Sequence, residues 1–384
     1  MDALLEKGKA MATALAPSPS LTLSRRLAQT PFTPRLEACG VRSYTIYNRT
    51  LLATCFHSPE EDYRHLKTHV QLWDVSCERQ VELKGPDAAR LAQLMTPRDL
   101  SKARIGQCLY APLVDEDGGM LNDPVILKLG EDRYWISIAD SDVLLWAKGL
   151  ALGMGLKVQV TQPEVWPLAV QGPKAEELMS RVFSEAVLSI GFFRCQRLAF
   201  RGHKLAVARS GFSKQGGFEI FIDSKHLCLE LWDALWQAGE ALEVRSGCPN
   251  QIERIEGGLL SYGNDMTRAN TPLECGLGRY CHLDRPIDFI GREALLRARD
   301  AGLKRQVRGL TVAGDPLPRC SQPWPVLAGC EEVGAVTSAC NSPDLGCGIA
   351  IAMLDRDHWD VGNEVTLETP AGSCQGRVVE LPFL

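Results

Sequence analysis

A glycine-rich turn between two strand-like stretches is the feature that most constrains the fold. Residues 210–217 read Ser-Gly-Phe-Ser-Lys-Gln-Gly-Gly, and the stretches on either side alternate in character with a period of two. After the turn, Phe218 and Ile220 fall on one face of the predicted strand, while Glu219 and Phe221 fall on the other. A carboxylate beside an aromatic ring suits a flat nitrogen heterocycle, because it accepts N–H bonds while the ring packs against the heterocycle. An ordinary hairpin with a solvated outer face is the alternative.

The first helix is expected to begin at Ser58, which can cap it, with Pro59 in its first turn. Leu66, Val70 and Trp73 then recur at helical spacing and predict one buried stripe that extends through Trp73. The sequence therefore predicts a helix that runs almost to the next strand.

Strands and helices are mixed through the middle of the chain. Further helices are expected at 142–152, 175–183 and 225–242, between short strands that are mostly antiparallel. This mixture predicts an α+β fold. Beyond residue 302, short strands separated by Gly, Pro, Asn and Asp predict a small β-barrel at the C-terminal end.

Composition restricts the partners that the chain can have. Of 384 residues, 45% are hydrophobic and 23% are charged, and the net charge is −5. Without a basic run or a long apolar run, we expect neither a nucleic-acid nor a membrane partner. The 14 cysteines contain no Cys-x-x-Cys pair, so we interpret them as reduced thiols of a cytoplasmic protein. His65 and His69 share a helix face but lack a third ligand, so no metal site is expected.

Seven segments resemble, in the same order, those of the glycine-cleavage aminomethyltransferase family. They are residues 73–76 (Trp-Asp-Val-Ser), 118–123 (Gly-Gly-Met-Leu-Asn-Asp), 171–173 (Gln-Gly-Pro), 210–221, 262–265 (Tyr-Gly-Asn-Asp), 272–277 (Pro-Leu-Glu-Cys-Gly-Leu) and 338–343. The loop at 213–217 is most similar to one branch of that family, the tetrahydrofolate-dependent dimethylsulfoniopropionate demethylases. The resemblance covers residues 24–384.

This resemblance implies the three-part aminomethyltransferase fold, which binds folate in a central channel. We therefore expect a folate-binding catalytic region of two subdomains over residues 24–302. Residues 1–23, which contain Ala, Ser and Pro, are expected from their composition to form a flexible extension. The small barrel is expected over residues 303–384.

The resemblance also implies the folate contacts. They carry over to Tyr110, Glu219, Phe221 and Arg254, with Glu219 expected to grip the pterin ring. Considered one at a time, Tyr110 would be read as a core residue, Glu219 as a solvated strand carboxylate and Arg254 as a helix-surface residue. The family pattern favours folate contacts over those interpretations.

Asn122 is the most informative departure from the family, which usually has Asp at this position. In aminomethyltransferases the leaving group is an amine, whose departure needs a proton. A sulfonium instead leaves as a neutral thioether, so a nucleophilic nitrogen and in-line placement are sufficient. We therefore predict that Asn122 and Asp123 line the reaction centre of a methyl transfer from sulfur.

The residues expected to face the methyl donor come from several segments. In the glycine-rich loop Gln215 and Gly216 stand where the family has Glu and Asp, and Lys214 adds a positive charge. This change favours an anionic group on the donor or on the folate tail, although a solvated lysine is an equal alternative. Phe212 stands where the demethylase branch commonly has Trp, and a cation binds less strongly over Phe than over Trp. The full set of predicted donor contacts is Phe212, Lys214, Trp135, Tyr44 and Ser137.

Together these features predict an enzyme that moves a methyl group from dimethylsulfoniopropionate to N5 of tetrahydrofolate. Its partners would be the methyl donor and folate, and a homodimer is possible. Three alternatives stay open: a glycine-cleavage aminomethyltransferase, a demethylase of another sulfonium or quaternary amine, and a folate-binding scaffold without turnover.

Overall fold

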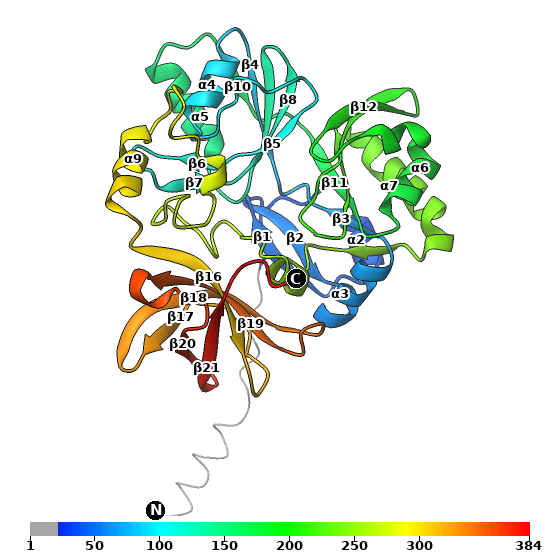
Figure 1. Ribbon diagram of the computed structural model, residues 1–384. Coiled ribbons are helices and arrows are strands. Elements are labelled where there is room, and N and C mark those ends of the chain that lie inside the picture. Colours follow the sequence, from blue (N-terminus) through cyan, green and yellow to red (C-terminus); the bar gives the residue numbers. More distant parts are fainter. Residues whose placement is uncertain (1–21) are drawn as a thin grey trace, which may run out of the picture.

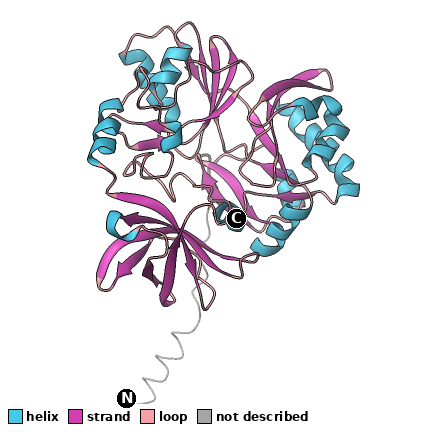
Figure 2. Cartoon of the chain, viewed as in Figure 1, coloured by secondary structure: helices cyan, strands magenta, loops and turns pink. Residues whose placement is uncertain are grey.

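Three lobes surround a common centre in the computed structural model, which describes residues 22–384 (Figure 1). The extension expected at 1–23 lies almost entirely outside the described residues. Figure 2 shows helices and strands mixed in two lobes and strands dominating the third. The predicted α+β class is confirmed by this arrangement.

The helices lie mainly on the outside of the two lobes in which helices and strands are mixed (Figure 1). Their bounds are α2 (Thr33–Ala38), α3 (Pro59–Thr68), α4 (Ala88–Leu94), α5 (Val143–Gly153), α6 (Ala175–Phe183), α7 (Lys225–Gly239), α8 (Gln251–Glu256) and α9 (Arg292–Ala301). The helices expected in the middle of the chain form as α5, α6 and α7. No helix between residues 22 and 384 combines the length and apolar character needed to cross a bilayer.

One lobe contains a six-stranded sheet that includes the strand after the glycine-rich turn. Its order is β12 (Cys195–Phe200), β13 (His203–Ala208), β14 (Gly217–Ile222), β11 (Trp166–Gln171), β3 (Gln71–Asp74) and β15 (Arg245–Gly247). Only the pairing of β15 with β3 is parallel. Phe218 and Ile220 of β14 lie in the main core of this lobe, as the alternation predicts.

The second lobe contains a five-stranded antiparallel sheet. Its order is β10 (Gln159–Thr161), β4 (Gln80–Lys84), β9 (Arg133–Ser137), β8 (Val125–Gly130) and β5 (Cys108–Tyr110). Two further hairpins lie near the centre, formed by β1 (Ser43–Tyr47) with β2 (Thr50–Cys55) and by β6 (Leu113–Val114) with β7 (Met120–Asn122).

The two large sheets meet across a small apolar cluster. Trp135 of β9 lies 6.0 Å from Phe221 of β14, measured between ring centroids, and both side chains are buried. Cys108 of β5 and Ala208 of β13 belong to the same cluster. The outer face of β14 is therefore covered by the other lobe at Phe221, whereas Glu219, two residues earlier, stays partly exposed.

The third lobe is a closed six-stranded barrel. The strands follow the order β16 (Arg305–Val312), β19 (Cys347–Asp355), β18 (Glu331–Ser342), β17 (Trp324–Ala328), β20 (Glu364–Thr369) and β21 (Gly372–Val379). The expected C-terminal barrel is confirmed, with β17 as a strand that the sequence pattern missed.

The helix predicted to run through Trp73 is shorter than expected. The cap is correct, because the Ser58 side chain accepts a hydrogen bond from the Glu61 N–H, but α3 ends at Thr68. Trp73 lies in β3 and is opposite Ala169 of β11. A segment buried on both faces satisfies helical and strand spacing equally, and the pairing with β11 and β15 decides in favour of the strand.

Candidate functional site

Gln171, at the end of β11, is bonded to the first half of the glycine-rich turn. Its Nε2 donates to the Ser210 carbonyl at 3.1 Å, and its Oε1 accepts from the Ser213 hydroxyl at 2.8 Å. Gly211 and Gly217 have positive φ angles, and a Cβ on either would collide with the Gln171 side chain. The glycines are thus required by a close approach, which fixes the start of β14 and the position of Glu219.

Three carboxyl groups from different segments gather near this turn. Glu219 accepts a hydrogen bond from the Ser210 hydroxyl, and Asp123 accepts one from the Tyr110 hydroxyl at 2.9 Å. Glu78 follows β3 and lies close enough to both carboxyl groups for their charges to act on it. Each of the three residues is partly exposed, so the cluster can be reached from outside.

The protein around the cluster disfavours negative charge. Burial raises the pKa of Asp123 to about 7, although the Tyr110 hydrogen bond opposes the rise. Burial also raises the pKa of Glu219, against the Ser210 hydrogen bond. Glu78 has its pKa raised by burial first and then by the charges of Glu219 and Asp123. Among residues 22–384, no Lys, Arg or His forms an ion pair with any of the three.

The backbone of Ala139 ties the segments of the cluster together. The Asn122 side chain donates to the Ala139 carbonyl at 3.0 Å and accepts from its N–H at 2.9 Å. Asn48, after β1, donates to the same carbonyl at 3.2 Å and to the Cys77 carbonyl at 3.0 Å. Asn48 and Asn122 therefore join the segments that carry Glu78 and Asp123 to the loop after β9.

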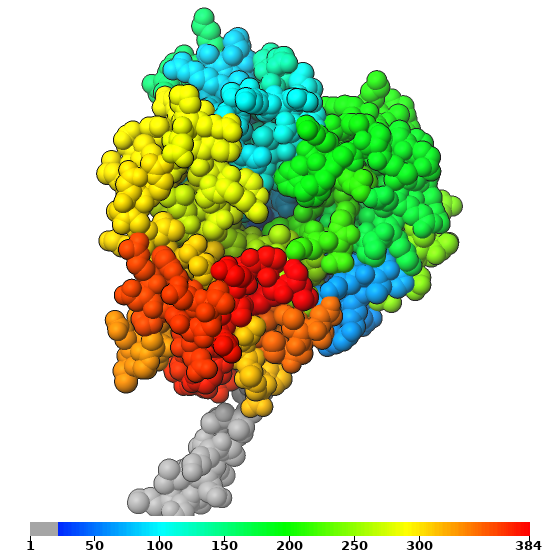
Figure 3. Space-filling model, viewed as in Figure 1, coloured from blue at the N-terminus to red at the C-terminus, as the bar shows by residue number. Residues whose placement is uncertain are grey.

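The cluster arises from elements that border the centre of the molecule. Figure 1 shows β1 and β2 between the lobes, with β5 and β3 nearby. The space-filling view is hollowed where the cyan and green lobes, the yellow segment and the red C-terminal segment meet (Figure 3). A cluster of acceptors with no paired cation among residues 22–384 suits a ligand that brings N–H donors or positive charge.

The predicted folate residues divide into two groups. Tyr110 and Glu219 belong to the carboxyl cluster, while Phe221 is 2% exposed and packs against Trp135. Arg254 on α8 is also buried, and its guanidinium donates to Asp265, Ser338, Gln251 and the Leu259 carbonyl. This arrangement joins α8 to the barrel, and a contact between Arg254 and folate stays a prediction.

Most predicted donor contacts are engaged elsewhere. The Trp135 indole donates to Glu82 at 2.9 Å, and the buried Ser137 hydroxyl accepts from Gln80 at 2.9 Å. Tyr44 packs against the core of the six-stranded lobe. Lys214 is exposed, and its Nζ donates to the Leu384 carbonyl at 3.0 Å.

Phe212 and Asn122 have contrasting environments. Phe212 lies in the glycine-rich turn and stays partly exposed, so its ring is available to a ligand. The Asn122 side chain is fully buried and bonded to Ala139 and Ser141, so its direct part in chemistry stays a prediction.

Sequence reasoning missed Glu78 and Tyr47. Tyr47 ends β1, and its pKa is raised by burial and then by the charges of Glu78 and Asp123, which places it at the same cluster. Tyr44, three residues earlier, was predicted instead. The available signal was Glu78 itself, an acidic residue two positions after the Trp-Asp-Val-Ser segment.

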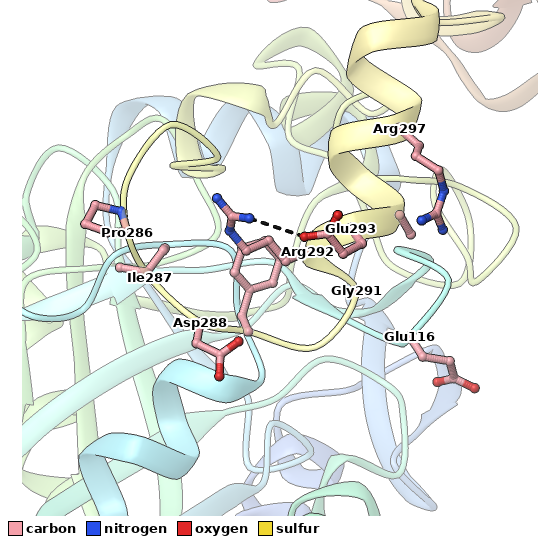
Figure 4. A pocket seen from close by; sticks show the side chains of 10 residues that line it. Glu116, Pro286, Ile287, Asp288, Gly291, Arg292, Glu293 and Arg297 are labelled. Carbon is pink, nitrogen blue, oxygen red and sulfur yellow. Dashed lines mark hydrogen bonds and ion pairs between the residues drawn. The ribbon is translucent and has the colours of Figure 1, made fainter.

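A separate open groove of about 490 Å³ lies between the loop before α9 and the start of that helix (Figure 4). Its charged lining includes Asp288, Arg292, Glu293 and Arg297, and Arg292 pairs with Glu293 at 3.4 Å. None of the predicted site residues lines it. The carboxyl cluster is therefore the better candidate site.

Two protein-family descriptions match most of the chain. Residues 36–285 match the family described as the GCVT N-terminal domain, and residues 305–384 match the glycine cleavage T-protein C-terminal barrel domain. The chain is 54% identical over 353 residues to dimethylsulfoniopropionate demethylase DmdA of Ruegeria pomeroyi, covering 92% of this chain and 96% of that protein.

More distant relatives share the same architecture. The chain is 33% identical to an aminomethyltransferase of Symbiobacterium thermophilum over 85% of this chain and 90% of that protein. The crystal structure of glycine cleavage system aminomethyltransferase T from Bartonella henselae superposes with a TM-score of 0.82 at 23% identity, covering 93% of this chain and 98% of that one. This last likeness supports the fold.

Proposed function

The chain belongs to the glycine-cleavage aminomethyltransferase (T-protein) family, and from this premise we propose that it is a tetrahydrofolate-dependent dimethylsulfoniopropionate demethylase. It moves a methyl group from the sulfonium to N5 of tetrahydrofolate and gives methylmercaptopropionate and 5-methyltetrahydrofolate. The 54% identity to a protein named for that activity supports the proposal over the aminomethyltransferase activity of relatives near 33% identity.

The single structural observation that carries the proposal is the cluster of Glu78, Asp123 and Glu219, which has no paired cation in the described part of the chain. Its chemistry fits both reactants. A pterin presents N–H groups that a carboxylate accepts, and a sulfonium presents a positive charge. We assign Glu219 to the pterin, because Ser210 and the glycine-rich turn fix its position.

The transfer is a direct displacement. When bound, tetrahydrofolate supplies the nucleophilic N5, which bears a proton. As the new C–N bond forms, the C–S bond breaks and its electron pair stays on sulfur, so a neutral thioether leaves without needing an acid. Asn122, which carries no ionisable proton, is compatible with this chemistry.

The proton on N5 must still depart after the methyl group arrives. Asp123 is the acceptor that we propose, because a carboxyl with a pKa of about 7 is partly ionised at neutral pH. The Tyr110 hydroxyl, which donates to Asp123 at 2.9 Å, holds that carboxyl in place and stabilises its charged form.

A donor screen tests the proposal. The enzyme is supplied with tetrahydrofolate and dimethylsulfoniopropionate, glycine betaine or an aminomethyl donor, and the folate product is identified by mass. We expect 5-methyltetrahydrofolate from dimethylsulfoniopropionate. A 5,10-methylene product would assign the chain to the aminomethyltransferases, and binding of folate without any product would make it a scaffold.

We also propose a cytoplasmic enzyme of sulfur and one-carbon metabolism. All 14 cysteines are free thiols, which suits a reducing compartment. The predicted division into residues 24–302 and 303–384 and the possible homodimer are part of the same proposal. Limited proteolysis near residue 303 and a measured molar mass in solution test these two points.

A further inference from the structure

Two polar side chains of the cluster have no partner in the part of the chain that the structure describes. The Glu78 carboxyl accepts no hydrogen bond there, and only its main chain is bonded: the N–H donates to the Val75 carbonyl at 2.9 Å, and the carbonyl accepts from Gln80 Nε2 at 2.9 Å. The Tyr47 hydroxyl has no hydrogen bond within residues 22–384 either. Glu219 and Asp123, in contrast, accept hydrogen bonds from Ser210 and Tyr110.

One amide joins the two segments that carry these side chains. Asn48 follows Tyr47, and its Nδ2 donates to the carbonyl of Cys77, the residue before Glu78, at 3.0 Å. Its own N–H donates to Asp140 at 2.8 Å, in the loop that Asn122 also holds. Asn48 has a φ of 48°, a left-handed conformation that asparagine tolerates. This conformation makes the tight turn that follows Tyr47.

The one basic neighbour of Glu78 in the chain, Arg79, donates to the Thr50 hydroxyl at 3.3 Å and forms no ion pair with Glu78, and the charges that act on Glu78 are acidic. Glu219 faces it from β14 and Asp123 from the end of β7, and their charges raise its pKa further after burial has done so. Tyr47 faces it from β1, and Cys77 and Asp140 lie near Tyr47. An ionised Glu78 in these surroundings needs a positive charge that the described chain does not provide.

We propose that Glu78 is the residue that binds the positive charge of the methyl donor, with the Tyr47 ring beside it as the aromatic wall of the same subsite. This inference rests on the proposed function and extends it to the recognition of the donor.

The chemistry gives Glu78 a binding role that kinetics can recognise. The positive charge leaves sulfur as the C–S bond breaks, so a carboxylate beside sulfur stabilises the bound donor more than the transition state. Removing its charge should therefore raise the KM of the donor and leave kcat unchanged or slightly increased. A residue with a merely structural role would not raise the KM of the donor while leaving kcat unchanged.

The test compares Glu78→Gln with wild type. We expect the KM of dimethylsulfoniopropionate to rise about tenfold or more, the range for a contact with a charged partner, with tetrahydrofolate affinity unchanged. Inhibition by 4-methylpentanoate, in which a neutral CH replaces the sulfonium sulfur, should be nearly equal in both proteins. Glu219→Gln is the matched control and should give the opposite pattern, with weaker folate binding.

Two further measurements complete the test. The wild-type KM should fall as pH rises through the ionisation of Glu78, and this dependence should be much reduced in Glu78→Gln. Tyr47→Phe should keep the wild-type KM, whereas Tyr47→Leu should raise it a few-fold because the ring face is lost.

The outcomes separate the inference from the function on which it rests. If wild type demethylates glycine betaine but not dimethylsulfoniopropionate, and Glu78→Gln raises the KM of that cation, the substrate is wrong and the cation subsite stands. If Glu78→Gln turns over dimethylsulfoniopropionate with the wild-type KM and pH profile, the function stands and the cation subsite is overturned.

Discussion

The Asn122 side chain forms two hydrogen bonds with the main chain of Ala139. It donates to the Ala139 carbonyl at 3.0 Å and accepts from the Ala139 N–H at 2.9 Å. A third bond joins the amide to the Ser141 hydroxyl at 2.8 Å. Asn122, which stands where the family usually has Asp, is thus also a structural joint between β7 and the loop after β9. An aspartate at this position would lack the two N–H donors.

Asn122→Asp should therefore destabilise the protein. Each buried group left without its partner costs roughly 1–3 kcal/mol, and a buried charge adds to this. We expect a lower melting temperature and lower activity at pH 8, with part of the stability regained near pH 4, where the new carboxyl is protonated. Ser141→Ala, which removes one of the three bonds, should have a smaller effect. Unchanged thermal melting of Asn122→Asp would show that the joint is not needed.

Glu219→Gln should weaken the binding of tetrahydrofolate. Hydrogen bonds to a charged acceptor contribute roughly 1.5–3 kcal/mol, equivalent to about a 10- to 150-fold loss of affinity. Calorimetric titration measures the loss. Ser210→Ala removes only the hydroxyl that positions Glu219 and should have a weaker effect in the same direction. Wild-type folate affinity in Glu219→Gln would remove this carboxylate from the site.

Asp123→Asn should stabilise the protein in a pH-dependent manner. The folded-state pKa of about 7 lies above the ordinary value of 3.8, so the cost of charging Asp123 is absent below about pH 4. This loss of unfolding free energy grows as pH rises and is complete above about pH 7. Each tenfold change in the acid dissociation constant corresponds to about 1.4 kcal/mol. Denaturant unfolding should thus show Asp123→Asn gaining stability over wild type between pH 4 and 7, while its turnover falls. A constant difference across this range would contradict the raised pKa.

Phe212 provides a test on the donor side of the turn. Its ring is partly exposed, so a substitution disturbs little packing. If the sulfonium also contacts this ring, the KM of the donor should rank Phe212→Trp below wild type and wild type below Phe212→Leu, with differences of a few-fold. Folate affinity and melting temperature serve as controls. Equal KM values in Phe212→Leu and wild type would confine the aromatic contact to Tyr47.

The sequence predicts local features better than features built from distant segments. Phe218 and Ile220 face the core as their alternation requires, and the Ser58 cap forms. Trp73 is placed wrongly because its spacing fits a helix and a strand equally, and only pairing with β11 resolves it. Glu78 and Tyr47 are missed for a similar reason, since neither belongs to a motif and their proximity depends on bonds made by Asn48.

The joint at Ala139 has a consequence for comparing this chain with others. Asn48 and Asn122 contact only the main-chain atoms of residue 139, so the identity of its side chain carries little information about the assembly of the site. An alignment would give the position no weight, and many substitutions there should be silent. Proline is the exception, because it removes the N–H that Asn122 Oδ1 accepts. In this chain the position can thus be essential through its main chain alone, and a saturation scan would reveal it through a single intolerant residue.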